Sequence, residues 1–167
     1  VRMALSGNLA DFPFTDSRRG QFLVTFKVAG ATLDYAQGWP PISAIDADVK
    51  FEGAGMSILA RSGEVHGAKV GPVSVAIPDL GAANPALTIA GNAQGPTSAF
   101  LAFVNGSPIG AWVDHVTDGV KATGDGRLDL KFTLPLGAAK DVKVAGDYEF
   151  LGNELHLPGV PPLGDVA

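Results

Sequence analysis

Residues 45–60 read IDADVKFEGAGMSILA, and this stretch decides the fold of the chain. In its first half apolar and charged residues alternate: Ile45, Ala47, Val49 and Phe51 are separated by Asp46, Asp48 and Lys50. Successive side chains of a β-strand point to opposite faces, so this period gives one dry face and one wet face. EGAG at 52–55 is a hairpin signal, and the alternation resumes after it. The stretch predicts an antiparallel hairpin that is apolar on one face only.

The same period of two recurs on both sides of this hairpin. Strands are predicted around residues 22–28, 73–77, 128–134 and 142–150, each with apolar side chains in one phase. Turn signals lie between strands, among them RSGE at 61–64, GP at 71–72 and GDG at 124–126. The predicted fold class is mostly β: antiparallel strands form an elongated, curled sheet, an open β-groove, with a short helical insertion near 97–117.

One uncharged segment departs from the strand pattern. A helix is predicted from a cap at Thr97 or Ser98 to a left-handed stop at Asn105-Gly106, and Ser107 caps a second helix. Two interpretations of this insertion stay open: a helical pair packed over the sheet, or a lid that competes with a ligand for the groove. The residues predicted to form the lid are Phe100, Phe103, Ile109 and Trp112.

The chain also begins to repeat itself. VTFKVAGATLDYA (24–36) aligns with GDYEFLGNELHLP (146–158) at an offset of 122 residues, and GWPPISAI (38–45) aligns with GVPPLGDV (159–166) after one residue drops out. Residues 7–45 therefore resemble residues 126–166. Residues 1–167 are predicted to form a single segment of a longer, repeat-built protein.

A sheet with one apolar face must cover that face. It can pack against a second sheet and close a sandwich core, or it can curl into a gutter filled by an apolar ligand. Composition does not separate the two solutions, whereas the repeat favours the gutter. The residues predicted to line this groove are Phe22, Val24, Phe26, Val28, Ile45, Val49, Phe51, Ile58, Leu130, Phe132, Val144, Tyr148 and Phe150.

Composition excludes several classes of function. The net charge of −5 argues against a nucleic-acid partner, which requires clustered Lys and Arg. The chain has no cysteine, so disulfides and thiol chemistry are excluded. The three histidines, at 66, 115 and 156, show no metal-ligand spacing, and no nucleophile motif is present. No catalytic residue, metal or cofactor is predicted.

Five runs of sequence resemble a known family: GWPPISAIDADVKFEGAGMSI (38–58), RSGEVHG (61–67), GPTSAFLAFVNGSPIG (95–110), GDGRLDLKFTLPLG (124–137) and GDYEFLGNELHLPGVPPLGDV (146–166). They are similar to the AsmA-like superfamily of Gram-negative bacteria, in particular its YhdP branch, and more distantly to TamB. The resemblance implies a periplasmic protein anchored in the inner membrane, with a long β-groove that bridges the two membranes for phospholipid.

The function predicted from these observations is not enzymatic. The chain is expected to be a lipid-conducting segment of a periplasmic protein that moves phospholipid between the inner and outer membranes. Its expected partners are phospholipid or another acyl-chain lipid and adjacent repeats of the same protein, and the isolated segment is expected to self-associate edge to edge. The alternative is a structural β-scaffold that binds protein partners along its sheet edges in envelope assembly.

Overall fold

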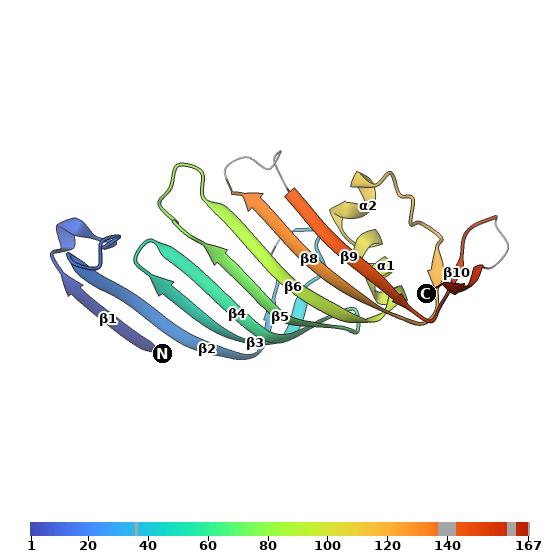
Figure 1. Cartoon of the computed structure of the whole chain (residues 1–167), viewed down its shortest axis with the longest axis horizontal. Coiled ribbons are helices and arrows are strands. Elements are labelled where there is room, and N and C mark those ends of the chain that lie inside the picture. Colours follow the sequence, from blue (N-terminus) through green and yellow to red (C-terminus); the bar gives the residue numbers. More distant parts are fainter. Residues whose placement is uncertain (36, 137–142, 160–162, 167) are drawn as a thin grey trace.

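The computed structural model describes residues 1–35, 37–136, 143–159 and 163–166, and it consists mainly of one large open sheet. Eight antiparallel strands follow one another in the order β1-β2-β3-β4-β5-β6-β8-β9 (Figure 1). Their bounds are Arg2–Gly7, Gly20–Leu33, Ile42–Glu52, Gly55–Val65, Ala68–Ile77, Ala86–Pro96, Asp125–Pro135 and Lys143–Leu151. The predicted fold class is confirmed.

Smaller elements flank this sheet. A 3-10 turn, η1 (Leu9–Asp11), lies between β1 and β2, and two helices, α1 (Thr97–Asn105) and α2 (Pro108–Trp112), separate β6 from β8. A second, three-stranded sheet has the order β11-β10-β7, formed by Leu163–Val166, Asn153–His156 and Lys121–Ala122. In Figure 1 it lies at the opposite end of the molecule from β1.

The large sheet is curved because the register between neighbouring strands is interrupted at similar positions along their length. The register shifts between Val28 and Ala31 on β2, between residues 43 and 47 on β3, and between Val70 and Val73 on β5. A β-bulge bends its strand and increases the local twist. Interruptions at one level therefore curl the sheet across its strands, which gives the gutter shape seen in Figure 1.

Two predicted turns were wrong, because their glycine and proline residues mark bends within strands. RSGE (61–64) lies inside β4 and GP (71–72) lies inside β5, while the chain turns between these strands at His66 and Gly67, both with positive φ. Gly71 has φ +127°, a conformation that favours glycine. Glycine and proline at these positions therefore mark bends within strands. The chain does turn at the predicted 52–55, whereas of the predicted turn at 124–126 only Gly124 precedes β8 and the other two residues lie within it.

The helix boundaries differ slightly from the prediction. The residue that precedes α1 is Pro96, so neither Thr97 nor Ser98 caps it, and Gly106 has φ −87°, which is not left-handed. Ser107 caps α2 as predicted, because its hydroxyl accepts a hydrogen bond from the Ile109 N–H at 3.3 Å. α2 ends at Trp112, so the predicted helical insertion near 97–117 is helical only as far as that residue.

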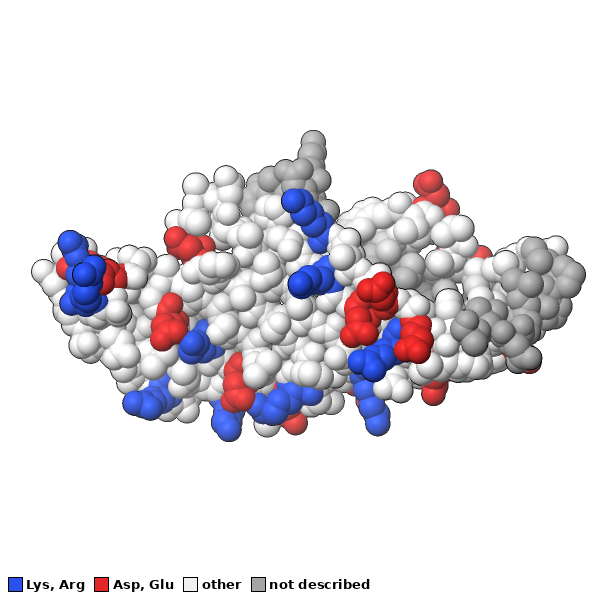
Figure 2. Space-filling model, viewed as in Figure 1, with Lys and Arg blue, Asp and Glu red and all other residues white. Residues whose placement is uncertain are grey.

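The wet face of the sheet carries the charged residues. Lys27 and Asp48 are cross-strand partners whose Nζ and Oδ1 atoms lie 4.0 Å apart, and Arg61 also pairs with Asp48. Figure 2 shows Lys and Arg interspersed with Asp and Glu over the face turned to the viewer. These side chains are exposed, so the ion pairs contribute little stability individually.

The opposite face gives the sheet almost no closed core. The buried apolar residues among those described are few: Phe14, Ala47, Val49, Ala68, Ile77 and Ala99. The solvent-accessible surface is 10488 Å², whereas a compact globular protein of 17.1 kDa exposes about 7,800 Å². The described residues thus form an open sheet, not a closed sandwich.

Candidate functional site

Cross-strand pairing aligns apolar side chains into rows that run across the strands. The longest row joins seven strands, β2 to β6, β8 and β9, through Phe26, Val49, Ile58, Val75, Ile89, Phe132 and Val144. Direct partners share one face of a sheet, and so do residues two apart on a strand. With a strand spacing of about 4.8 Å, this row extends about 29 Å and contains no charged residue.

The residues predicted to line a groove lie in this phase. Phe22, Val24 and Val28 flank Phe26 on β2, Phe51 follows Val49 on β3, and Leu130, Tyr148 and Phe150 occupy the same phase on β8 and β9. Ile45 lies beyond the register shift of β3, where it pairs with Ala31. Val142, at the start of the predicted last strand, lies outside the described residues.

This apolar face is only partly shielded from water. Val49 is 8% exposed, but Phe26, Ile58 and Phe132 are half-buried. At the two edges of the sheet the face is open: Met3 on β1 is 62% exposed and Val144 on β9 is 59% exposed. An exposed apolar surface of this length is typical of a binding site.

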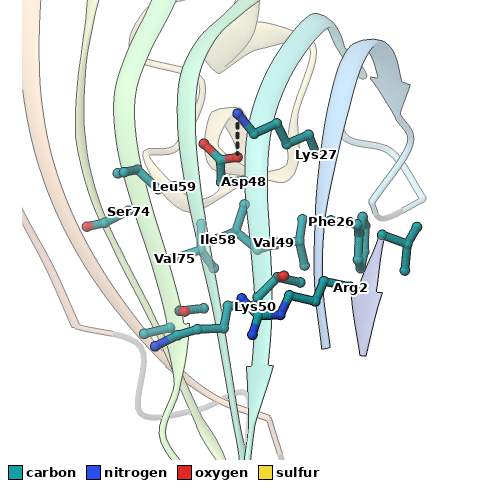
Figure 3. Close-up of a pocket in the computed structure, with 14 residues that line it drawn as sticks. Arg2, Phe26, Lys27, Asp48, Val49, Lys50, Ile58, Leu59, Ser74 and Val75 are labelled. Atoms are coloured by element: carbon teal, nitrogen blue, oxygen red, sulfur yellow. Dashed lines mark ion pairs between the residues drawn. The ribbon is translucent and has the colours of Figure 1, made fainter. Parts of the chain in front are cut away.

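A hollow of ≈ 820 Å³ lies on the wet face of the sheet, opposite the apolar face. Part of its lining comes from the row of Phe26, Val49, Ile58 and Val75 (Figure 3). The rest comes from the two rows that flank it: one includes Lys27, Asp48, Leu59 and Ser74, and the other includes Arg2, Lys50 and Ser57. The flanking rows point to the wet face, and none of the apolar neighbours Val24, Val28, Ala47 or Phe51 contributes. This hollow is therefore separate from the apolar face.

Helix α1 packs on the apolar face beside β9. The ring of Phe100 meets the ring of Tyr148 edge-on with centroids 5.2 Å apart, and Tyr148 meets Phe150 in the same way at 4.8 Å. In Figure 1 both helices lie near β8 and β9. The helical insertion thus covers one end of the apolar face, and Phe100 lies on it.

A polar cluster fixes the start of α1. The Tyr148 hydroxyl donates to Thr97 Oγ1 at 2.8 Å, and the Asn153 side-chain amide donates to the same oxygen and, at 2.8 Å, to the Thr123 carbonyl. Thr97 and Asn153 are 3% and 1% exposed. Burial raises the pKa of Tyr148, with a smaller raising effect from Asp125, and the hydrogen bond to Thr97 lowers it. With the net shift upward, the hydroxyl stays protonated and a donor at neutral pH.

We expect Thr97→Val to destabilise the protein by about 1–3 kcal/mol, because it removes the acceptor shared by the buried Asn153 amide and the half-buried Tyr148 hydroxyl. Urea unfolding followed by circular dichroism measures this difference. Thr88→Val is the matched control, since the hydroxyl of Thr88 donates to Ala76 on the exposed face of β6. Equal stability of the two variants would show that the cluster does not hold α1.

The far end of the helix pair reaches the connection between β2 and β3. The ring centroid of Trp39 lies 6.0 Å from those of Phe103 and Trp112, and Pro40 is buried near Gly106. Nine helical residues span about 13 Å, close to the three strand spacings of about 14 Å that separate β6 from β3. α1 therefore extends across the strands, from the end of β6 to the β2–β3 connection.

The aromatic contact at this far end is half open to water. Ile109 and Phe103 are half-buried, but Trp112 is 63% exposed and Val116 is 72% exposed. Trp112, one of the residues predicted to form the lid, is thus mostly exposed, and its ring contacts that of Trp39. The two ends of the helix pair are held differently, by buried hydrogen bonds at Thr97 and by exposed aromatic contacts at Trp39.

The described residues do not group their ionisable side chains for metal binding. They contain no cluster of three His, Asp or Glu side chains that could hold a metal ion. None of their helices is long and apolar enough to span a membrane. His115 lies 3.3 Å from Asp118 in an exposed pair, which is an ordinary surface interaction.

Comparison with known protein families matches residues 1–166 to the family described as YhdP protein. The chain belongs to the YhdP family. No curated protein and no solved structure matches the chain. The YhdP family is an envelope-associated, lipid-transport-type family and is not known for enzymatic activity. The open apolar face of the sheet agrees with membership in a lipid-transport-type family.

Two features of this YhdP-family segment were not predicted from the sequence. One is the cluster of Thr97, Tyr148 and Asn153, in which Thr97 is 51 and 56 residues from its two partners along the chain. The other is the contact of Trp39 with the helix pair. The signal in the sequence was weak: Asn153 is the one amide in an otherwise charged and apolar run, and Trp39 precedes a Pro-Pro pair.

Proposed function

We propose that this chain is a lipid-binding and lipid-conducting segment of a periplasmic protein that moves phospholipid between the inner and outer membranes. The observation that carries the proposal is the uncharged row from Phe26 to Val144, which crosses seven strands and stays partly exposed. Membership in a lipid-transport-type family supports the same conclusion.

The mechanism is desolvation along a uniform wall. Acyl chains lie along the apolar rows, and each CH₂ group removed from water contributes roughly 0.8 kcal/mol. Because neighbouring rows are chemically alike, a chain that slides by one row loses and gains similar contacts. Headgroups stay in water at the open side of the curled sheet. No covalent step and no cofactor takes part.

The helix pair acts as a lid over one end of this path. Phe100 and Phe103 lie where an acyl chain would pass, beside Tyr148 and Trp39. The exposed aromatic end at Trp112 is the end that opens, because fewer buried contacts hold it than hold Thr97. The lid and a lipid compete for the same apolar surface.

Lipid bound to the purified protein tests this function. Organic extraction followed by mass spectrometry is expected to recover phospholipid or another acyl-chain lipid in amounts near one molecule or more per chain. A protein of similar size and charge with a closed core, purified from the same cells, is the control. Recovery no greater than in that control would favour the alternative, a structural β-scaffold that binds proteins along its open edges at β1 and β9.

A further inference from the structure

Four aromatic rings meet where the helix pair reaches the β2–β3 connection. Trp39 lies at their centre, because the ring centroids of Tyr35, Phe103 and Trp112 each lie 6.0 Å from its own. The planes of these three rings are inclined to the plane of Trp39 by 48°, 54° and 67°. We call these four residues the Trp39 cluster. Since no ring is stacked flat on Trp39, the ring faces meet at an angle, as they do in the aromatic sites that bind ammonium groups.

The Trp39 cluster is open to water. Trp112 is 63% exposed and Tyr35 is 41% exposed, whereas Trp39 and Phe103 are half-buried. A cluster that served packing alone would bury both of its indole rings, because these large side chains stabilise a fold through the apolar area they bury. The exposed aromatic surface is therefore available to a ligand.

The fixed charges beside these rings are negative. The segments that carry the rings, the β2–β3 connection and the helix pair, contain no Lys or Arg. Asp34 directly precedes Tyr35, and Asp114 follows Trp112 by two residues; both aspartates are exposed. Among the ion pairs of the described residues, neither carboxylate has a Lys or Arg partner.

Both carboxylates are close enough to act on a charge at the rings. The Cα atoms of residues two apart in sequence lie at most about 7.6 Å from each other. This separation is within the screening length of about 8 Å at physiological ionic strength. A cation at the exposed rings is therefore attracted by Asp34 and Asp114, whereas an anion is repelled.

We propose that the Trp39 cluster binds an alkylammonium group, whose positive charge lies against the ring faces and is balanced by Asp34 and Asp114. The face of an aromatic ring attracts a cation within about 6 Å of its centroid, and indole attracts it most strongly. The group belongs either to a small ammonium compound or to the headgroup of a phospholipid. The second source rests on the proposed function.

The position of the cluster is one at which a headgroup would emerge. Phe103 belongs to the cluster and also to α1, which covers one end of the apolar face. An acyl chain that lies on this face beneath the helix pair leaves its headgroup in water at the end of the pair, beside Trp112. The lipid that this arrangement selects is one whose headgroup carries an ammonium group.

Choline tests the site directly. Trp39 and Trp112 are the two tryptophans of the chain, so indole fluorescence reports on the cluster alone. We expect choline to change this fluorescence saturably at roughly millimolar concentrations. The control ligand is 3,3-dimethylbutan-1-ol, which has the shape of choline without its charge and should bind at least about tenfold more weakly. Equal affinities for the two ligands would overturn the proposal, because apolar contact alone would then explain the binding.

Three variants locate the binding. Trp112→Leu keeps an apolar side chain but removes a ring face, so choline affinity should fall at least about tenfold, while circular dichroism stays unchanged because Trp112 is mostly exposed. Asp114→Asn should weaken choline binding several-fold, and Asn tolerates the φ of +51° at this position. Asp147→Asn is its matched control, an exposed aspartate on β9, and should have no effect. Unchanged choline affinity in Trp112→Leu would also overturn the proposal.

Short-chain phospholipids distinguish the two sources of the ammonium group. Dihexanoyl phosphatidylcholine and dihexanoyl phosphatidylglycerol carry the same acyl chains and differ in the headgroup. If a lipid is the ligand, phosphatidylcholine should act at lower concentration than both choline and phosphatidylglycerol, whereas equal affinities for choline and phosphatidylcholine would identify a free ammonium compound. Stronger binding of phosphatidylglycerol would contradict the proposal. Phospholipid recovered by extraction from a protein that does not bind choline would remove this inference and leave the proposed function standing.

Discussion

A carboxylate at position 58 should strip lipid from the apolar face. Ile58 lies in the middle of the long row, between Val49 and Val75, and is half-buried. An ionised carboxylate in this row keeps its hydration shell, and bringing an acyl chain over it costs several kcal/mol. We therefore expect Ile58→Asp to reduce bound lipid at least about tenfold in the extraction experiment, and to abolish phospholipid transport in the full-length protein.

The adjacent residue provides the matched control. Ser57 is also half-buried on β4, but it points to the wet face, where its cross-strand partners are Lys50 and Ala76. A new carboxylate in Ser57→Asp therefore meets water and a lysine, and lipid content should not change. Equal loss of lipid in both variants would contradict the assignment of function to one face.

A second pair of variants separates lipid loss from unfolding. Val144 ends the same row on the edge strand β9 and is 59% exposed, so Val144→Asp should leave the thermal midpoint unchanged. Its neighbour Ala145 is exposed in the opposite phase and takes the same substitution as control. If Ile58→Asp unfolds the protein and Val144→Asp binds lipid normally, position 58 belongs to a stabilising core and not to a conduit.

The alternation of the sequence was sufficient to predict which side chains share a face. Strand period is a local property, and the two short turns that join β3 to β4 and β4 to β5 are enough to fix the register of these three strands. The part of the row through Val49, Ile58 and Val75 follows from these two facts, whereas the place of Phe132 depends on pairing across the helical insertion between β6 and β8. Glycine and proline signals were less reliable, because Gly71 and Pro72 serve a bend within β5, where the same backbone freedom is needed as in a turn.

Contacts between distant parts of the chain could not be predicted in this way. Whether Trp39 meets α1 depends on how far the sheet curls, and the curl is the sum of several bulges whose size the sequence does not state. The helix pair was predicted from capping residues, which are local, but its position over Tyr148 depends on Asn153, which lies beyond the next two long strands.

The largest effect on the lid is expected from one methyl group, in Gly126→Ala. Gly126 is buried opposite Phe150 on β8, and a Cβ atom there would lie 2.9 Å from Cε1 of Tyr148 and closer still to its hydroxyl. Tyr148 must then rotate away, which breaks its hydrogen bond to Thr97 and its contact with Phe100. Overpacking of this kind costs about 1–3 kcal/mol, and the attachment of α1 is lost with it.

Two measurements check this expectation. Urea unfolding gives the loss of stability, and the fluorescence of Trp39 and Trp112 should shift as the helix pair leaves the β2–β3 connection. In a Tyr148→Ala background the same Gly126→Ala substitution should be neutral or slightly stabilising, since the obstructing ring is gone and alanine is preferred to glycine within a strand by roughly 0.5–1 kcal/mol. If Gly126→Ala destabilises both backgrounds equally, Tyr148 does not transmit its effect, and the polar cluster is not the fixed end of the lid.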